Sequence, residues 1–381
     1  MLGSARNRPL RATCSGACNS SRVGFSGKIG YAANSSDLQH PADRRRFPVW
    51  AESRGVDWEI ADPSKQYDLV VVTPRADLNL WRTKTSGQSK LIFDMVDSYL
   101  AIPATNLKQA LRGPAKFLAG EANTPFYSYR KAIERIVEQA DAVTCATPEQ
   151  ASALVPFNDN VHSILDIHSG LIRSIKDDYA AHQPFRLVWE GLGTNVHWFE
   201  LIAPVLAEVA QQHPICLNII SDIEFHEFVQ KFGRRRVAAI TSDFADDVRL
   251  YQWSEDFLSL IATNCDLAVI PLPVDRAYAT DKPESKLVSF WRMGLPVVTA
   301  ATPAYKRVMS DAGQELTCVD QQQWLSAITR MIEDAGEREQ AGREGRRYAD
   351  QVYGEEQLLA RWDSVIESLE TDSGRSRATD A

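Results

Sequence analysis

Short aliphatic runs alternate with longer segments of helical periodicity along this chain. Each run is four or five residues long and almost continuously apolar, which is typical of strands buried on both faces of a parallel sheet. The clearest runs are 68–72, 90–93 and 142–145 in the first half of the chain, and 185–189, 216–220 and 267–270 in the second. Because the alternation occurs twice, the sequence predicts an α/β fold with two doubly wound, Rossmann-like domains that face each other across a cleft.

The length of 381 residues agrees with two domains of roughly 100–200 residues each. We expect an N-terminal domain at 21–166, a hinge at 167–183, a C-terminal domain at 184–340 and terminal helices at 341–370. Residues 1–20 contain three arginines and no acidic residue, a composition that fits a transit peptide, a disordered leader or a start assigned too far upstream. Within the C-terminal domain, the apolar spacing predicts helices at 198–212 and 224–232.

Composition excludes several classes of function. The formal net charge of −8 argues against general nucleic-acid binding, which needs a basic face. The six cysteines are scattered without the spacing of metal ligands, so we expect reduced thiols in a cytoplasmic protein. No apolar run approaches the roughly 20 residues of a membrane span, which leaves room only for peripheral contact with the inner face of a membrane.

The segment 281–305, DKPESKLVSFWRMGLPVVTAATPAY, carries the most functional information. It predicts a helix with Asp281 as N-cap and Gly294 at its end, followed by a buried strand. Lys282, Ser285 and Lys286 would then lie in the first turn, where unpaired N–H groups favour an anion such as phosphate. The alternative is a solvated lysine pair. Lysines in a first turn carry a penalty of roughly 0.3–1 kcal/mol, which a bound anion would remove.

Three parts of this segment resemble the nucleotide-sugar domain of GT-B glycosyltransferases, and the retaining family four in particular. They are Lys286, the run from Gly294 to Val298, and Ala304 with Tyr305. The resemblance implies transfer of a sugar from a nucleoside-diphosphate sugar to a glycan, lipid or small-molecule acceptor. It implies that the C-terminal domain binds the donor and that the terminal helices cross back to the N-terminal domain. We expect neither a cofactor nor a metal, because the helix dipole and the lysine would replace a divalent ion and no D-x-D motif lies at a plausible strand end.

Two departures from the family pattern concern charge. The family's two glutamates fall on Asp281, which keeps a carboxylate able to accept sugar hydroxyls, and on Ser289, which does not. The family's arginine and lysine after the strand at 185–189 are replaced by Leu192 and the region 196–197. Loss of such preorganised donors can lower turnover by about 10²–10³.

A glycine-rich turn, EGLGTN, follows the strand at 185–189 directly. Ligands bind at the carboxyl ends of strands in doubly wound sheets, so Gly191 and Gly193 are predicted to bring backbone N–H groups close to a phosphate. Thr194 would add a hydroxyl donor. The alternative is a tight turn without a ligand.

At four further sites the sequence allows both a functional and a structural interpretation. Asp97 could deprotonate or bind an acceptor hydroxyl, or it could cap the next segment. His168 could approach the sugar from the hinge or be structural, and Trp253 could stack on a base or sugar or lie in the core. The arginines at 44–46 could attract an anionic acceptor or lipid phosphate, or form a solvated helix face.

Two other functions fit the same architecture. One is a sugar-nucleotide epimerase, which needs acid and base groups around the cleft. The other is a catalytically silent protein that binds a sugar nucleotide or acts as a scaffold, which the missing cations and Ser289 favour.

Overall fold

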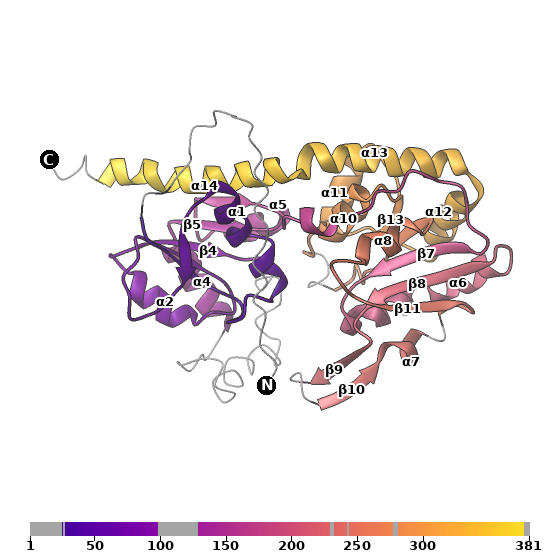
Figure 1. Ribbon diagram of the computed structural model, residues 1–381, viewed down its shortest axis with the longest axis horizontal. Helices are drawn as coiled ribbons and strands as arrows, with labels where there is room; N and C mark the ends of the chain where they lie inside the picture. Colours follow the sequence, from indigo (N-terminus) through magenta and orange to yellow (C-terminus); the bar gives the residue numbers. More distant parts are fainter. Residues whose placement is uncertain are drawn as a thin grey trace, which may run out of the picture.

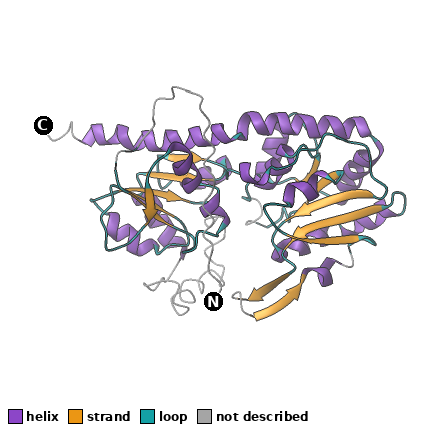
Figure 2. Ribbon diagram, viewed as in Figure 1, coloured by secondary structure: helices purple, strands orange, loops and turns teal. Residues whose placement is uncertain are grey.

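The computed structural model describes residues 25, 27–97, 129–228, 232–241, 244–276 and 281–376. It contains two six-stranded parallel sheets, one in each half of the chain, which confirms the predicted α/β fold with two doubly wound units (Figures 1 and 2). The N-terminal sheet has the order β2-β1-β3-β4-β5-β6, with β1 (Ile29–Ala32), β2 (Trp58–Ile60), β3 (Leu69–Val72), β4 (Lys90–Asp94), β5 (Ala142–Cys145) and β6 (Val161–Ser163). The C-terminal sheet has the order β11-β8-β7-β12-β13-β14, with β7 (Phe185–Glu190), β8 (Ile215–Ser221), β11 (Val248–Gln252), β12 (Leu267–Ile270), β13 (Val297–Ala300) and β14 (Thr317–Cys318).

Helices cover the sheets in both units. In the N-terminal unit they are η1 (Pro41–Arg44), α1 (Phe47–Arg54), α2 (Leu78–Thr85), α4 (Tyr129–Gln139) and α5 (Pro148–Leu154). After the connecting turn η2 (Ser169–Leu171), the C-terminal unit has η3 (Gly193–Leu201), α6 (Ala203–Ala210), α7 (Val237–Thr241), α8 (Leu258–Thr263), α10 (Ser285–Arg292), α11 (Pro303–Asp311) and α12 (Gln321–Glu333).

The last two helices run along both units (Figure 1). Helix α13 (Ala335–Tyr353) packs on α10 and α12, and α14 (Glu355–Ser376) packs on α1, β5 and β6. The contact with the N-terminal unit is specific, because Trp50 Nε1 donates to Asp363 Oδ1 at 2.7 Å and Trp362 is fully buried beside Trp50. A continuous C-terminal segment therefore ties the two sheets together.

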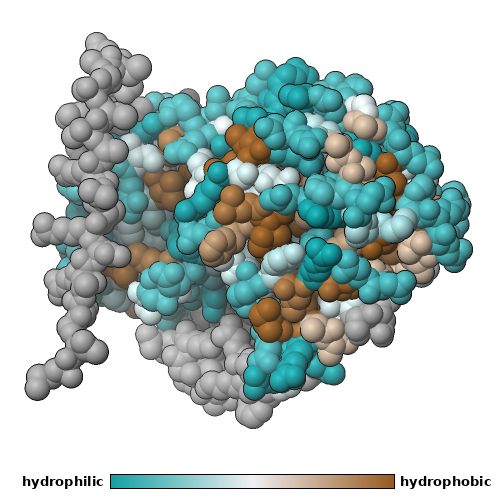
Figure 3. All heavy atoms as spheres, turned by 45° about the vertical axis from the view of Figure 1, so that its right-hand side comes forward, coloured by the Kyte–Doolittle hydropathy of each residue, from teal (hydrophilic) through white to brown (hydrophobic). Residues whose placement is uncertain are grey.

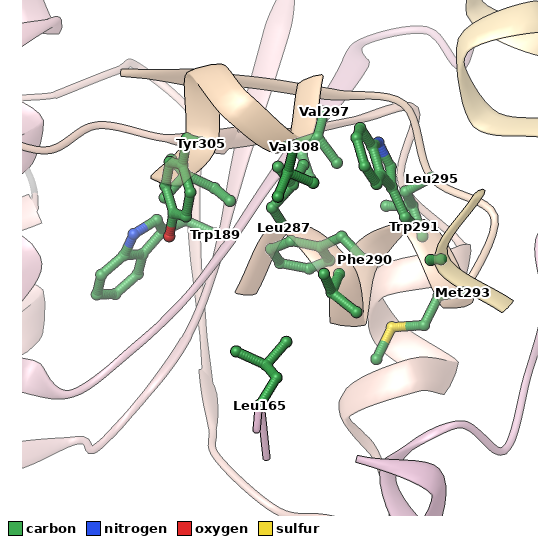
Figure 4. Packing of buried hydrophobic residues seen from close by; sticks show 14 of the residues in the cluster. Leu165, Trp189, Leu287, Phe290, Trp291, Met293, Leu295, Val297, Tyr305 and Val308 are labelled. Carbon is green, nitrogen blue, oxygen red and sulfur yellow. The ribbon is translucent and has the colours of Figure 1, made fainter. Parts of the chain in front are cut away.

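Helix α10 is held by apolar packing on several sides. Leu287, Phe290 and Trp291 are buried in one apolar cluster with side chains of β7, β13 and α11 (Figure 4), and the Trp291 ring also lies against Tyr348 of α13. Among their neighbours in the same core cluster are Trp189 and Tyr305. Large aromatic and branched side chains leave few alternative packings, so this helix is a rigid support for the residues in its first turn.

Two local predictions in the C-terminal unit are wrong. The described part of the predicted helix at 224–232 is not helical, because β9 (Glu224–Phe228) and β10 (Phe232–Arg236) pair as antiparallel strands, and Glu224 forms ion pairs with Arg234 and Arg236 across them. Residues 198–212 are not one helix either. The 3₁₀ turn η3 ends at Leu201, and Pro204 near the start of α6 fits the first turn of a new helix.

Among the described residues, no helix combines the length and apolarity that crossing a membrane needs. On the face drawn in Figure 3, apolar side chains lie in separate groups among hydrophilic ones.

Candidate functional site

The helix that carries Lys286 begins three residues later than the sequence predicts. Helix α10 starts at Ser285 with Glu284 as its N-cap residue, so the prediction of Asp281 as N-cap is wrong and Lys282 lies before the first turn. Tertiary hydrogen bonds explain the difference. Gln150 Nε2 donates to the Asp281 carbonyl at 3.1 Å, and the Glu284 carboxylate accepts from Arg307 at 3.0 Å and from Tyr353 at 2.8 Å.

The end of this helix agrees with the prediction. Gly294 has a φ of 81°, and the Leu295 N–H donates to the Phe290 carbonyl at 3.0 Å, the 6→1 bond of a Schellman motif. The strand β13 follows at Val297. Only Ser285 and Lys286 therefore share the first turn, where N–H groups have no partner inside the helix.

Lys286 is three-quarters buried, with a side chain that is 27% exposed. Its Nζ donates to the Glu190 carbonyl at 2.5 Å, lies 3.8 Å from Glu190 Oε2 and sits 4.8 Å from the ring centre of Trp189. Burial lowers the pKa of Lys286, and Glu190 opposes that shift while Lys282 adds to it. The ammonium has three N–H donors, of which one is used by the carbonyl, so a bound anion would both pair with it and relieve its desolvation.

The absence of a side chain at Gly191 leaves the space that the Lys286 side chain occupies. A Cβ at Gly191 would lie 2.4 Å from Lys286 Nζ and 2.5 Å from the Trp189 ring, which is closer than real Cβ contacts. The Gly191 N–H donates to the Ile220 carbonyl at 3.1 Å, and the Gly193 N–H donates to Asp222 Oδ2 at 3.3 Å. The two amides predicted to face a phosphate are therefore engaged, and Gly191 instead provides space for the lysine.

A pocket of about 150 Å³ lies between the two units, and Lys286 lines it. Its walls combine charged, polar and apolar side chains from both halves of the chain. The residues are Arg45, Asp166, His168 and Leu171 on one side, and Glu190, Leu258, Ser285, Lys286, Ser289, Phe290 and Met293 on the other. The lysine thus faces an interdomain crevice together with Ser285, Ser289 and His168 from the predicted site.

His168 enters the pocket as a neutral side chain. It is 5% exposed, and its Nδ1 has no hydrogen-bond partner among the described residues. Burial lowers the pKa of His168 to about 3, and the nearby charges of Arg45 and Arg292 add to the shift. A neutral imidazole can donate or accept a hydrogen bond with a sugar hydroxyl.

The other predicted residues lie around the pocket and do not line it. Asp97 is exposed just after β4, and Thr194 is exposed at the start of η3. Burial lowers the pKa of Lys282, and the Asp97 carboxylate works against this shift, so these two residues of different units lie close enough to interact. Lys282 Nζ also lies 5.3 Å from the ring centre of Trp198.

Trp253 directly follows β11 and is partly buried against the main core. The guanidinium of Arg45 lies 6.0 Å from its ring centre, and the Trp253 Nε1 has no hydrogen-bond partner among the described residues. Its ring therefore supports a pocket residue.

The arginines at 44–46 do not form one solvated face. Arg46 is fully buried, donates to Asp94 Oδ1 at 2.8 Å and to the Ile164 carbonyl at 2.6 Å, and pairs with Asp166 at 3.2 Å. Asp94 is consequently a structural carboxylate. Arg45 lines the pocket. Sequence alone could not identify which arginine would do so, because the three identical neighbours differ only in their long-range contacts.

The described residues contain no group of three or more His, Cys, Asp or Glu side chains that could hold a metal ion. The cysteines within the described part, Cys145, Cys216, Cys265 and Cys318, are buried free thiols.

Comparison with known proteins places the fold. No family model and no curated protein matches the sequence. Among solved structures, the chain is similar to TarM at a TM-score of 0.55 and 11% identity over 78% of this chain, and it spans 54% of the length of TarM. It is similar to Anabaena HepE in complex with UDP at a TM-score of 0.56 and 13% identity, over 90% of this chain and 100% of HepE.

A third similar structure is the α,α-trehalose 6-phosphate synthase of Burkholderia multivorans, at a TM-score of 0.51 and 11% identity over 84% of this chain and 73% of that enzyme. These three structures are GT-B glycosyltransferases. At such low identity the similarity concerns the fold, and family four stays a prediction. The chain has the GT-B fold, with two Rossmann-like units and a pocket between them.

Proposed function

We propose that this protein is a glycosyltransferase that transfers a sugar from a nucleoside-diphosphate sugar to an acceptor hydroxyl. One observation carries the proposal: Lys286, in the first turn of α10, places a largely desolvated ammonium in the pocket between the two units. An ammonium beside a helix N-terminus is suited to a diphosphate, because both favour negative charge. The complex of HepE with UDP supports a uridine nucleotide as the first donor to test.

The remaining predicted residues are assigned roles around this anchor. Ser285 and Ser289 offer hydroxyls beside Lys286 in the pocket, and neutral His168 faces them from the hinge. Asp281 would accept hydrogen bonds from sugar hydroxyls. The pocket is smaller than the roughly 300–1,000 Å³ of sites that enclose drug-sized ligands, so it fits the diphosphate and sugar better than a whole donor.

The reaction assigned to this arrangement is a substitution at the sugar. The bond between C1 of the sugar and the diphosphate oxygen breaks, and its electron pair stays on the diphosphate, which Lys286 and the start of α10 stabilise. C1 joins the acceptor oxygen, and the proton of that hydroxyl passes to Asp97, the candidate base of the N-terminal unit. Retention of configuration is part of the proposal through the family resemblance, and independence of metal is part of it because the helix dipole and Lys286 would replace a divalent ion.

The acceptor is proposed to be a glycan, a lipid or a small molecule. A direct test incubates the full chain with radiolabelled UDP- and GDP-sugars and mixed acceptors, and measures release of nucleoside diphosphate and formation of labelled product. Nuclear magnetic resonance of the product gives its anomeric configuration. Transfer that disappears in Lys286→Met supports the proposal, whereas transfer at the wild-type rate in that variant contradicts it.

A second candidate is a protein that binds a sugar nucleotide without transferring the sugar. Ser289 in place of a glutamate and the absent cation pair after β7 favour it. The two candidates differ in one observable. Saturable UDP binding, with neither transfer nor donor hydrolysis for any sugar nucleotide tested, would favour the binding protein.

A further inference from the structure

Arg45 differs from Arg44 and Arg46 in the ion pairs that its guanidinium forms. Arg44 Nη1 lies 2.7 Å from Glu255 Oε1, whereas Arg45 Nη2 lies 3.6 Å from the same oxygen. Arg46 is held by two buried carboxylates. Of the three guanidinium groups, that of Arg45 has the weakest ion pair.

The Arg45 side chain is nevertheless mostly buried, at 14% exposed. Its Nε is enclosed and has no hydrogen-bond partner within the described part of the chain. Arg44 Nε also lacks a partner, but Arg44 does not line the pocket. A buried donor without an acceptor costs about 1–3 kcal/mol, so the Arg45 guanidinium is held in the pocket wall at an energetic cost.

Arg45 is fixed from two sides. Its carbonyl accepts the Ile167 N–H at 2.8 Å, and its guanidinium lies 6.0 Å from the centre of the Trp253 ring. These contacts hold an N-terminal residue against the C-terminal unit, in the pocket that Lys286 also lines. Because the pocket measures only about 150 Å³, one bound group can contact both walls.

The acids of the pocket do not neutralise this arginine. Asp166 is bound to Arg46, and Glu190 is the carboxylate nearest to Lys286. His168 beside it is neutral and has an unpartnered Nδ1. The pocket therefore presents cations from both walls to whatever binds between them.

We infer that Arg45 is a second diphosphate ligand, supplied from the N-terminal unit, and that it compensates for the cations missing after β7. The inference rests on the proposed function. A departing diphosphate carries more negative charge than one ammonium can pair, and a guanidinium offers several N–H donors in a planar fork suited to phosphate oxygens. With a cation on each wall, binding of the diphosphate also favours the closed arrangement of the two units.

The test measures binding of UDP, UDP-glucose, inorganic pyrophosphate and uridine to the full chain by isothermal titration calorimetry. The variants are Arg45→Gln, Arg45→Lys and the matched control Arg44→Gln. We expect Arg45→Gln to weaken UDP and pyrophosphate at least tenfold and to leave any uridine affinity unchanged. Arg45→Lys should retain part of the affinity, and Arg44→Gln should stay within twofold of wild type.

Two results would overturn the inference while leaving the proposed function in place. In the first, Arg45→Gln binds UDP with an affinity within twofold of wild type, whereas Lys286→Met loses UDP binding. In the second, Arg45→Gln and Arg44→Gln weaken UDP binding equally, which would indicate that only the overall positive charge of this region matters. If the wild-type chain binds neither UDP nor GDP, the proposed function fails as well. Thermal melting of each variant shows whether it folds. If Arg45→Gln does not fold, the UDP affinity of Arg45→Lys tests the inference instead.

Discussion

Substitution of Lys286 by methionine removes the ammonium and keeps most of the side-chain volume. The charge-assisted hydrogen bond between the ammonium and a phosphate oxygen contributes about 1.5–3 kcal/mol. At 1.4 kcal/mol for each factor of ten, the expected loss of UDP affinity is about 10- to 150-fold. Isothermal titration calorimetry at constant ionic strength measures this loss, with Lys306→Met as the control because Lys306 is exposed on α11.

The same substitution should have little effect on folding. Burial lowers the pKa of Lys286, so the ammonium costs stability below its folded pKa, and the cost disappears as the pH rises above the unfolded value. Methionine removes that cost but also loses the hydrogen bond to the Glu190 carbonyl, worth about 1 kcal/mol, so the opposing effects leave the melting temperature within roughly 2–4 °C. A variant that melts far below wild type, or that binds UDP normally, would refute the assignment of Lys286 as a ligand held at an energetic cost.

Three further predictions follow from the same geometry. Gly191→Ala places a methyl group 2.5 Å from the buried Trp189 ring and 2.4 Å from Lys286 Nζ, so it should destabilise the fold by about 1–3 kcal/mol in urea unfolding and weaken UDP binding. In wild type, UDP affinity should fall as the pH rises through the lowered pKa of Lys286, because the neutral amine no longer attracts phosphate, and calorimetry of Lys286→Met should show no such fall. Glu149→Gln breaks the 2.7 Å ion pair with Arg307 that joins α5 to α11, so small-angle scattering without ligand should show a larger radius of gyration.

Each of these has its own control and contrary outcome. Gly170→Ala adds a methyl group in open space and should leave both stability and UDP binding unchanged. If UDP affinity depends on pH in the same way in wild type and in Lys286→Met, a group other than Lys286 causes the pH dependence. An unchanged radius of gyration in Glu149→Gln would mean that the helices α13 and α14 alone hold the two units together.

The sequence predicted the features that depend on local residue types. Short aliphatic runs identified most strands of both sheets, because buried parallel strands have few polar positions. The end of α10 was predictable since a left-handed residue after a helix strongly favours glycine, and Gly294 is that residue. Lys286 in the first turn and its place in a crevice between the units followed from the same segment.

Features that depend on distant partners could not be predicted. The start of α10 is set by Gln150 and Arg307, which hold Asp281 and Glu284 from other helices. The apolar spacing at 224–232 fits a helix, but cross-strand pairing with 232–236 makes a hairpin instead. Arg45 is distinguished from its neighbours by long-range features, namely its weak ion pair with Glu255, its contact with Trp253 and the pocket that it lines.

A crystal structure of the full chain with UDP would show whether Lys286 binds the diphosphate. We expect the diphosphate in the pocket between the units, with a phosphate oxygen within hydrogen-bond distance of Lys286 Nζ and close to the N–H groups of Ser285 and Lys286. UDP bound with its diphosphate elsewhere, and Lys286 still engaged only by Glu190, would refute the role of Lys286 as a diphosphate ligand.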